Sequence, residues 1–492
     1  MNRPHHELER PGARRTRSRW WTVGLAGLAL ATTVGVSVAP AADAVARAAT
    51  DDRPPTSDHR DDNPSDKGKG KKKPKGVPVP CKADALIAAI THANARGGAV
   101  LDLATKCTYT LTTNIDGAGL PAIATPITLN GGKHTTITRA AAAEQFRILT
   151  VEVGGDLTLN HLKITGGQTT ENGGGVSVAA GGSAAISHSK ILDNITSQGG
   201  GGIFNQGTAF VTDSSINRNI AGETGGGISS SGPLKVVKSH IDRNTANVGG
   251  GVAAAGATVR EGSITGNKAA LSAGGMLIDG GIGTVVGTHV TGNTAGDVVG
   301  GIAVTDGGQL TLRRVGLTDN TAGNVGGLFV SGPISNGTSF AVIEDSLIKN
   351  NNAGSNGGGI SNQGVTTLRR ATVAGNEAGD QGGGIYNTLG GTVRLFDTKV
   401  VKNVAVTDGG GIFNDGGTVE LNIASGTLWS RTGRTTAPAT FPAALDSNRV
   451  RQIHEGSRSA AWRCAGSLRR IYAVSARACR RRWRGRSCPP GP

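Results

Sequence analysis

The chain has 492 residues and a formal net charge of +16, but the charge is unevenly distributed. Residues 81–422 carry 22 Lys/Arg against 24 Asp/Glu, whereas residues 1–80 carry 15 against 9 and residues 423–492 carry 14 against 2. The central region is therefore not basic. This argues against a nucleic-acid partner, because nucleic-acid-binding domains present a clustered basic surface.

Residues 1–44 are predicted to be a secretory signal peptide. Four arginines within residues 14–19 precede an apolar run from Trp20 to Val38, and small residues suited to cleavage fill residues 39–44. Positive charge, an apolar run and a small-residue cleavage site are the three parts of such a signal. An uncleaved membrane anchor is the alternative. No later segment reaches 18 apolar residues, so we expect no other membrane contact and an extracellular location.

Residues 45–80 are rich in Asp, Pro, Lys and Gly and include the run Lys71-Lys72-Lys73-Pro74-Lys75. This composition buries too little apolar surface to fold, so the segment is predicted to be a disordered linker. A tether to an anionic cell wall is the functional alternative, and association with the cell wall stays open.

Residues 81–114 are predicted to form an N-terminal cap. A helix is expected from Ala83 to Ala95, with Leu86 and Ile90 on one face. Cys81 and Cys107 flank this helix, and secretion permits a disulfide between them. The bridge is expected to hold the cap over the first coil of the repeat region, where an open end would expose a sheet edge.

Residues 115–422 contain one asparagine about every 25 residues. The series is Asn194, Asn219, Asn244, Asn267, Asn293, Asn320, Asn351, Asn376 and Asn403. A run of glycines closed by one apolar residue recurs at the same interval, for example at Ile203 and Ile228. Periods of this length indicate a stacked repeat array.

The residue three before each asparagine is Ile, Val or Leu, the residue five before is mostly small, and the one between them is mostly polar. This alternation is typical of a half-buried strand. One repeat cannot bury its own apolar face, so neighbours must stack about 4.8 Å apart and align their asparagines in a ladder. We predict an all-β, right-handed parallel β-helix (a solenoid) of roughly ten coils, with about three short strands per coil.

The repeat Ile216-Asn217-Arg218-Asn219 and the Gly-Gly-Gly-Ile turn resemble the repeats of polymorphic outer-membrane-protein-like β-helices, with Ile replacing their Phe. The segment from Cys81 to Ile90, with Cys107-Thr108-Tyr109, is similar to the cap of secreted actinobacterial β-helix proteins of the pectate-lyase-like superfamily. The resemblance implies the fold. It implies no single activity, because this fold hosts lyases, hydrolases, adhesins and passive scaffolds.

Catalytic motifs are sparse in residues 81–422. Paired aspartates with Gly-His-Gly and Arg-x-Lys motifs, as in polygalacturonase-like hydrolases, are absent. A pectate-lyase-like site needs acidic Ca²⁺ ligands on adjacent coils and a base. The nearest approximation is Asp193 and Asp242 with Arg218 and Arg243, without the family's surrounding motifs. Ca²⁺ is expected only in that case, and no other metal or cofactor is expected.

Charges alternate in sign at the position six residues before the asparagine. The column is His188, Asp213, Lys238, Glu261, Gly287, Arg314, Asp345, Arg370 and Asp397. Stacking would bring opposite charges together as cross-coil ion pairs, each contributing about 0.2–1 kcal/mol at a surface. A glycan-binding stripe is the alternative interpretation of this column.

The last segment, residues 423–492, lacks the repeat and contains arginine but no lysine. It is either a genuine basic tail or a segment translated out of frame. Two functions remain for the whole protein. The first is a secreted, monomeric, non-catalytic β-helix that presents a long adhesin-like surface to polysaccharide or cell wall. The second is a divergent polysaccharide lyase or hydrolase acting on glycans that contain uronic acid.

Overall fold

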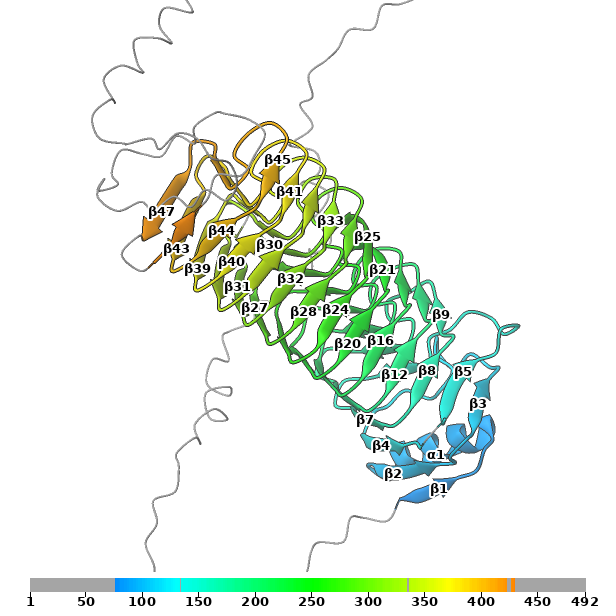
Figure 1. Cartoon of the computed structure of the whole chain (residues 1–492). Coiled ribbons are helices and arrows are strands. Elements are labelled where there is room, and N and C mark those ends of the chain that lie inside the picture. The colour runs from blue at the N-terminus through cyan, green and yellow to red at the C-terminus, as the bar shows by residue number, and fades with distance from the viewer. Residues whose placement is uncertain (1–75, 133, 334–335, 423–425, 430–492) are drawn as a thin grey trace, which may run out of the picture. The chain divides into compact units, whose positions relative to one another are not determined.

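The computed structural model describes residues 76–132, 134–333, 336–422 and 426–429. They form a parallel β-solenoid, a β-helix of about 13 coils, and α1 (Ala83–Ala95) is the one helix among them (Figure 1). The all-β fold predicted from the repeats is confirmed, while its right-handedness stays a prediction. The predicted signal peptide, almost all of the linker and nearly all of the tail lie outside the described residues.

Four parallel sheets run along the stack, and successive strands of each coil belong to sheets A, B, C and D in turn. Sheet A consists of β1 (Val77–Val79), β2 (Ala99–Leu103), β4 (Pro126–Asn130), β7 (Asp156–Asn160), β11 (Ser183–Ser187), β15 (Thr208–Thr212), β19 (Leu234–Val237), β23 (Ala257–Arg260), β27 (Ile282–Val286), β31 (Gln309–Arg313), β35 (Phe340–Glu344), β39 (Val365–Arg369), β43 (Thr392–Phe396) and β47 (Thr418–Asn422). Sheet B consists of β3 (Thr108–Leu111), β5 (Thr136–Arg139), β8 (Lys163–Thr165), β12 (Lys190–Leu192), β16 (Ser215–Asn217), β20 (His240–Asp242), β24 (Ser263–Thr265), β28 (His289–Thr291), β32 (Gly316–Thr318), β36 (Leu347–Lys349), β40 (Thr372–Ala374), β44 (Lys399–Val401) and β48 (Leu428–Trp429).

Sheets C and D complete each coil. Sheet C consists of β9 (Gln168–Thr169), β13 (Ile195–Thr196), β17 (Ile220–Ala221), β21 (Thr245–Val248), β25 (Lys268–Ser272), β29 (Thr294–Ala295), β33 (Thr321–Ala322), β37 (Asn352–Ala353), β41 (Glu377–Ala378) and β45 (Val404–Ala405). Sheet D consists of β6 (Leu149–Val151), β10 (Val176–Val178), β14 (Ile203–Asn205), β18 (Ile228–Ser230), β22 (Val252–Ala254), β26 (Met276–Asp279), β30 (Ile302–Thr305), β34 (Leu328–Val330), β38 (Ile360–Asn362), β42 (Ile385–Asn387) and β46 (Ile412–Asn414).

A typical coil therefore has four strands, and the expectation of three was wrong. The extra strand, in sheet C, is often only two residues long, as in Ile220–Ala221, so no periodicity could reveal it. Its inward residue is a buried alanine in most coils, including Ala221, Ala246 and Ala269. Small side chains here allow the wall of the coil to approach the core closely.

The alternation predicted before each asparagine is confirmed in sheet B. Ile216 is 0% exposed and lies between Ile191 and Ile241, its register partners on the neighbouring coils. The first and third residues of these strands point outward instead. Aliphatic side chains from successive coils thus form one continuous core.

The nine repeated asparagines form the predicted ladder, and each is 0% exposed. Oδ1 of Asn219 accepts hydrogen bonds from the backbone nitrogen (3.1 Å) and Nδ2 (3.0 Å) of Asn194. Nδ2 of Asn219 donates to the carbonyl of Ile191 and to Oδ1 of Asn244, both at 3.0 Å. Each amide therefore satisfies buried turn groups of the neighbouring coil as well as the next asparagine.

The two corners on either side of sheet B are made by single residues in the left-handed conformation. The residue before each ladder asparagine and the residue six before it have φ between about 45° and 65°, as at Arg218 (53°), Lys238 (48°) and Arg314 (53°). A non-glycine residue costs roughly 1–2 kcal/mol in this region. The hydrogen bonds between stacked coils must outweigh that cost. The left-handed corners are therefore stable only when neighbouring coils are stacked.

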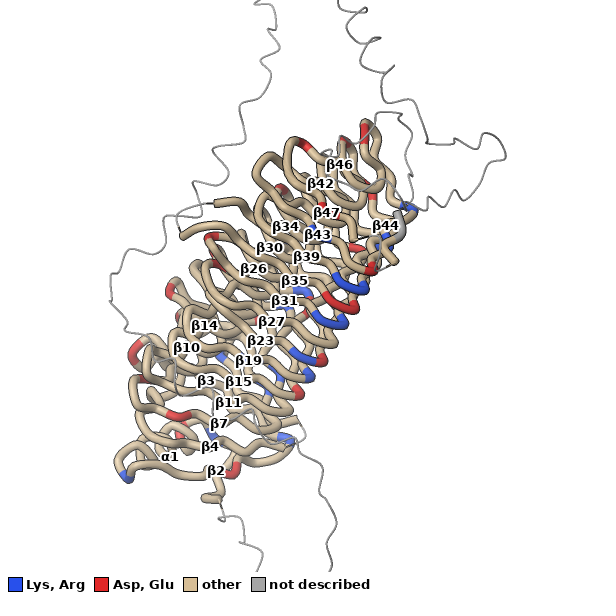
Figure 2. The backbone as a smooth tube through the Cα atoms, turned by 90° about the vertical axis from the view of Figure 1, so that its left-hand side faces the viewer, with Lys and Arg blue, Asp and Glu red and all other residues tan. Residues whose placement is uncertain are grey.

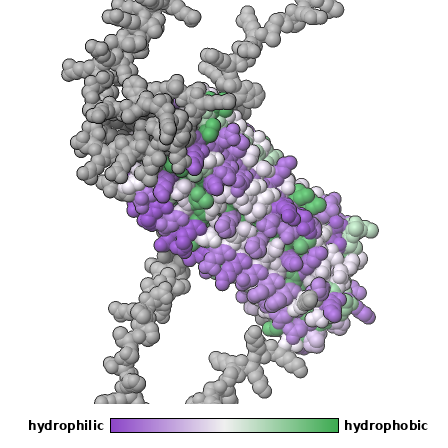
Figure 3. Space-filling model, viewed as in Figure 1, coloured by the Kyte–Doolittle hydropathy of each residue, from purple (hydrophilic) through white to green (hydrophobic). Residues whose placement is uncertain are grey.

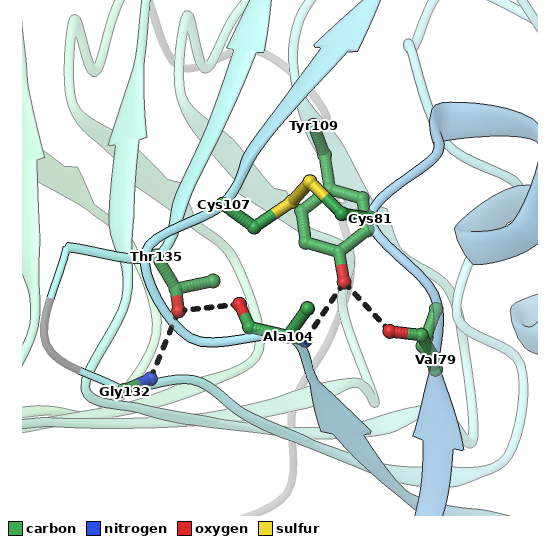
Figure 4. The surroundings of a disulfide bond; sticks show 7 residues. All are labelled: Val79, Cys81, Ala104, Cys107, Tyr109, Gly132 and Thr135. Carbon is green, nitrogen blue, oxygen red and sulfur yellow. Dashed lines mark hydrogen bonds between the residues drawn. A yellow bond between two sulfur atoms is a disulfide. The ribbon is translucent and has the colours of Figure 1, made fainter.

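A disulfide joins Cys81 to Cys107 as predicted, and α1 covers the first coil (Figures 1 and 4). Beside it, the fully buried Tyr109 hydroxyl accepts a hydrogen bond from the backbone nitrogen of Ala104 (2.9 Å) and donates to the carbonyl of Val79 (3.0 Å). Burial raises the pKa of Tyr109. The tyrosine thus ties β1, which lies at the end of the predicted linker, to the rest of the cap.

Asn244→Ala should lower the free energy of unfolding by at least about 1–3 kcal/mol, since it leaves the buried backbone nitrogen of Asn219 without its acceptor. Denaturant unfolding monitored by circular dichroism measures the effect. Lys268→Ala, at an exposed outward position of sheet C, is the control and should change stability by less than about 0.5 kcal/mol. Equal effects of the two variants would contradict the stabilising role of the ladder.

Reduction of the Cys81–Cys107 bridge should destabilise the cap by about 2–4 kcal/mol, the usual contribution of a disulfide. We expect a lower melting temperature in dithiothreitol and the same decrease in the double variant Cys81→Ser/Cys107→Ser. The double variant should then be insensitive to dithiothreitol. A melting temperature independent of the bridge would show that packing of α1 alone holds the cap.

Candidate functional site

The outer face of sheet B is the best candidate for a binding surface. Its outward residues from β20 to β40 are mainly Ser, Thr and His, and the face is largely hydrophilic with small apolar patches (Figure 3). Hydroxyl groups line up along it, as in the pair Thr291 and Thr318, whose oxygens lie 2.9 Å apart. The face is thus a regular array of hydrogen-bonding groups spaced by the strand separation.

A slot interrupts this array at Gly316, the first of the two outward residues of β32. Its neighbours in the same outward column are His289 on β28 and Leu347 on β36. Because Gly316 has no side chain, the imidazole and the leucine stand on either side of bare backbone. The slot belongs to a shallow depression of about 600 Å³, which Arg314, Thr318, Asp345, Arg370 and Thr372 also line.

Two strand spacings, about 9.6 Å, separate the backbones of β28 and β36. The imidazole of His289 leans into this interval over Gly316, so a ring bound there would lie between the imidazole and Leu347. Gly316 does not have a left-handed φ, and a Cβ placed there would meet no backbone atom within 4 Å, only the imidazole of His289, 3.1 Å from Nδ1 and 3.8 Å from Cε1. The backbone therefore does not require glycine at this position. Folding of the coil does not explain why the side chain is missing here.

The charged column at the corner between sheets A and B forms the edge of this face, and charges of both signs follow it along the stack (Figure 2). Cross-coil ion pairs were predicted there, and two of the ion pairs found among the described residues lie in this column. Arg370 binds Asp345 through Nε (2.6 Å) and Nη2 (3.2 Å), and Nζ of Lys238 lies 4.0 Å from Glu261. The hydrogen bond from Arg370 holds the pKa of Asp345 below its ordinary value.

The four residues of the lyase hypothesis do not share one centre. Asp193 and Arg218 form a two-bond ion pair at the corner between sheets B and C, with both distances 2.8 Å. Asp242 points outward from β20, and its pKa is raised by burial, which outweighs the charges of His240 and Arg243 and a hydrogen bond from Ser263. Both oxygens of Asp193 are bound by arginine, which does not suit a Ca²⁺ ligand.

A polar cluster that sequence reasoning missed surrounds Asp242. Nδ1 of His240 lies 2.8 Å from the hydroxyl of Ser263 on the next coil, in the same outward column. Here the serine lies between the histidine and the aspartate, so the imidazole is not placed to activate the hydroxyl under carboxylate control, as a Ser-His-Asp triad requires. The only signal in the sequence was that the three residues are outward on adjacent repeats.

The described residues contain no group of three His, Cys, Asp or Glu side chains arranged to hold a metal ion. Within the same residues, no helix is long and apolar enough to cross a membrane. Comparison of the chain with protein-family models, curated proteins and solved structures found no significant match.

Asp242→Asn should raise the melting temperature at pH 7, because burial disfavours the charged carboxylate in the folded state. The folded pKa is raised, so the native state binds more protons and stability falls as pH rises through that pKa. The advantage of the variant should therefore vanish below about pH 4, where the aspartate is protonated in both states. Melting curves from pH 3 to pH 8 test this, and a constant difference would contradict it.

Proposed function

We propose that the protein is a secreted, non-catalytic β-helix that binds polysaccharide along the outer face of sheet B. The observation that carries the proposal is the slot over Gly316, open to solvent between His289 and Leu347 within a row of hydroxyl-bearing side chains. A polysaccharide of the cell wall or of the surroundings is the expected partner, and one chain of the protein is sufficient to form the site.

The chemistry of the slot suits a sugar ring. A pyranose has an apolar C–H surface on its faces and hydroxyl groups around its rim. Leu347, which is 37% exposed, and the exposed imidazole of His289 offer two walls for the ring faces. Thr318 and Thr372 offer hydroxyl groups that both donate and accept hydrogen bonds. A few such polar groups around an apolar contact are typical of small-ligand sites.

The array of coils extends the site along the sheet. A polysaccharide lying across successive strands would meet Ser263, Thr291 and similar residues at intervals of about 4.8 Å. Each hydrogen bond at such a surface contributes little, so affinity must come from many weak contacts made together. Core packing holds this long face rigid on every coil. The protein therefore loses little conformational entropy when it makes these contacts.

Cleavage of a uronic-acid glycan is the second candidate function, favoured by the raised pKa of Asp242 beside His240. The pairing of Asp193 with Arg218 counts against the Ca²⁺ site that a lyase of this kind would use. Assays of polyuronide and neutral-glycan cleavage, with and without Ca²⁺, separate the two functions. Product formation that is lost in Asp242→Asn would favour the enzyme.

Gly316→Val tests the binding function, because valine is favoured in strands and fills the slot. Because the exposed imidazole of His289 must move aside for the new Cβ, we expect a melting temperature close to that of the wild type. Glycan binding should be at least tenfold weaker in a glycan-array and calorimetric assay of the full chain. Ala185→Val, which adds the same side chain to an outward position of sheet A, is the control. Unchanged binding by Gly316→Val would place the site elsewhere.

A further inference from the structure

We propose that the glycan unit bound over Gly316 carries an anionic substituent, a carboxylate, sulfate or phosphate ester, and that Arg314 recognises it. This inference rests on the proposed glycan binding. The shape of the slot suits any sugar ring, whereas Arg314 would select a ring that carries an anion.

The charged column is interrupted beside Arg314. Along the corner between sheets A and B, Lys238 pairs with Glu261 and Arg370 pairs with Asp345. Arg314 lies between these pairs. Its neighbour on the preceding coil is Gly287, which replaces the charged residue found at this position in the neighbouring repeats. The arginine therefore has no counter-ion on that side.

On the other side of Arg314, the neighbouring carboxylate of Asp345 is already paired. Both carboxylate oxygens of Asp345 accept hydrogen bonds from Arg370. None of the ion pairs found among the described residues includes Arg314 or its neighbour Arg313. Both arginines favour the charged form of Asp345, which shows that their charges act on the same small area. Glu344 is the register partner of Arg313 on the next coil, so Arg314 carries the unbalanced positive charge at the edge of the depression.

The position and the chemistry of Arg314 also suit recognition of an anion. The exposed Arg314 lines the depression together with Gly316 and His289, so its guanidinium lies beside the slot. A guanidinium matches the planar or tetrahedral oxygens of carboxylate, sulfate and phosphate with paired hydrogen bonds, and these are stronger than bonds between neutral groups. An anion on the bound sugar would take the place of the counter-ion that Gly287 does not supply.

The test compares one glycan backbone with different substituents. We would measure binding of the full chain to dextran, carboxymethyl dextran, dextran sulfate and dextran phosphate at a fixed ionic strength near 0.15 M. We expect the charged forms to bind about tenfold more tightly than dextran. Arg314→Gln should abolish this difference between the charged dextrans and dextran, and the rank of the three charged forms identifies the substituent.

Two variants sharpen the comparison. Gly287→Asp places a counter-ion beside Arg314 at a corner whose φ of 56° aspartate tolerates, as it does at Asp213 and Asp397 in the same column. It should also abolish the preference for charged dextrans, with at most a small fall in melting temperature from the new contact with Glu261 on its other side. Arg96→Gln makes the same charge change as Arg314→Gln at an exposed residue after α1, and should leave the preference intact.

The outcomes separate the two proposals. Binding of all dextrans with equal affinity, or equal losses in Arg314→Gln and Arg96→Gln, would overturn the role of Arg314 while leaving glycan binding in place. Failure of every dextran and of the glycan array to bind would instead overturn the proposed function, and this inference with it.

Discussion

The buried asparagine ladder is the interaction on which the rest of this structure depends. Each coil must turn sharply between sheets B and C, and the turn leaves backbone donors and acceptors inside the protein. A fully buried amide such as Asn219 satisfies them on the neighbouring coil and simultaneously binds the next asparagine. An apolar side chain at this position would leave those groups unpaired, at about 1–3 kcal/mol each. The spacing of one asparagine therefore fixes the register of all four sheets.

That register decides what the outer surface can contain. Single left-handed residues form the corners, so side chains at the corners project outward and meet their equivalents on adjacent coils. Long charged residues occupy this conformation at Lys238 and Arg314, where glycine or asparagine would be less strained. Opposite charges on consecutive coils offset part of that cost through pairs such as Arg370 and Asp345. A shift by one coil would bring like charges together.

Function in such an array is expected where the repeat is broken. Most outward positions follow a regular pattern, and two glycines depart from it close together. Gly316 opens a slot in sheet B, and Gly287 removes a counter-ion at its edge. Gly287 has a left-handed φ, but charged residues adopt it elsewhere in the same column. Both departures therefore remove side chains that the backbone would have accepted.

The sequence alone determined the stacking of the coils, because the ladder asparagines and the apolar residues three before them recur with a period that only a solenoid satisfies. It also paired Cys81 with Cys107, since the two cysteines flank one short helix. It missed a second amide ladder in sheet D, where Nδ2 of Asn362 and of Asn387 each bind the next coil, although Ile-x-Asn recurs in several repeats. Only the tertiary structure placed His240 against Ser263 and Gly316 between His289 and Leu347. Those contacts join residues that are 23 to 31 positions apart. Because the repeat length varies over this range, the sequence does not show which outward side chains share a column. The pairing of the strands decides it.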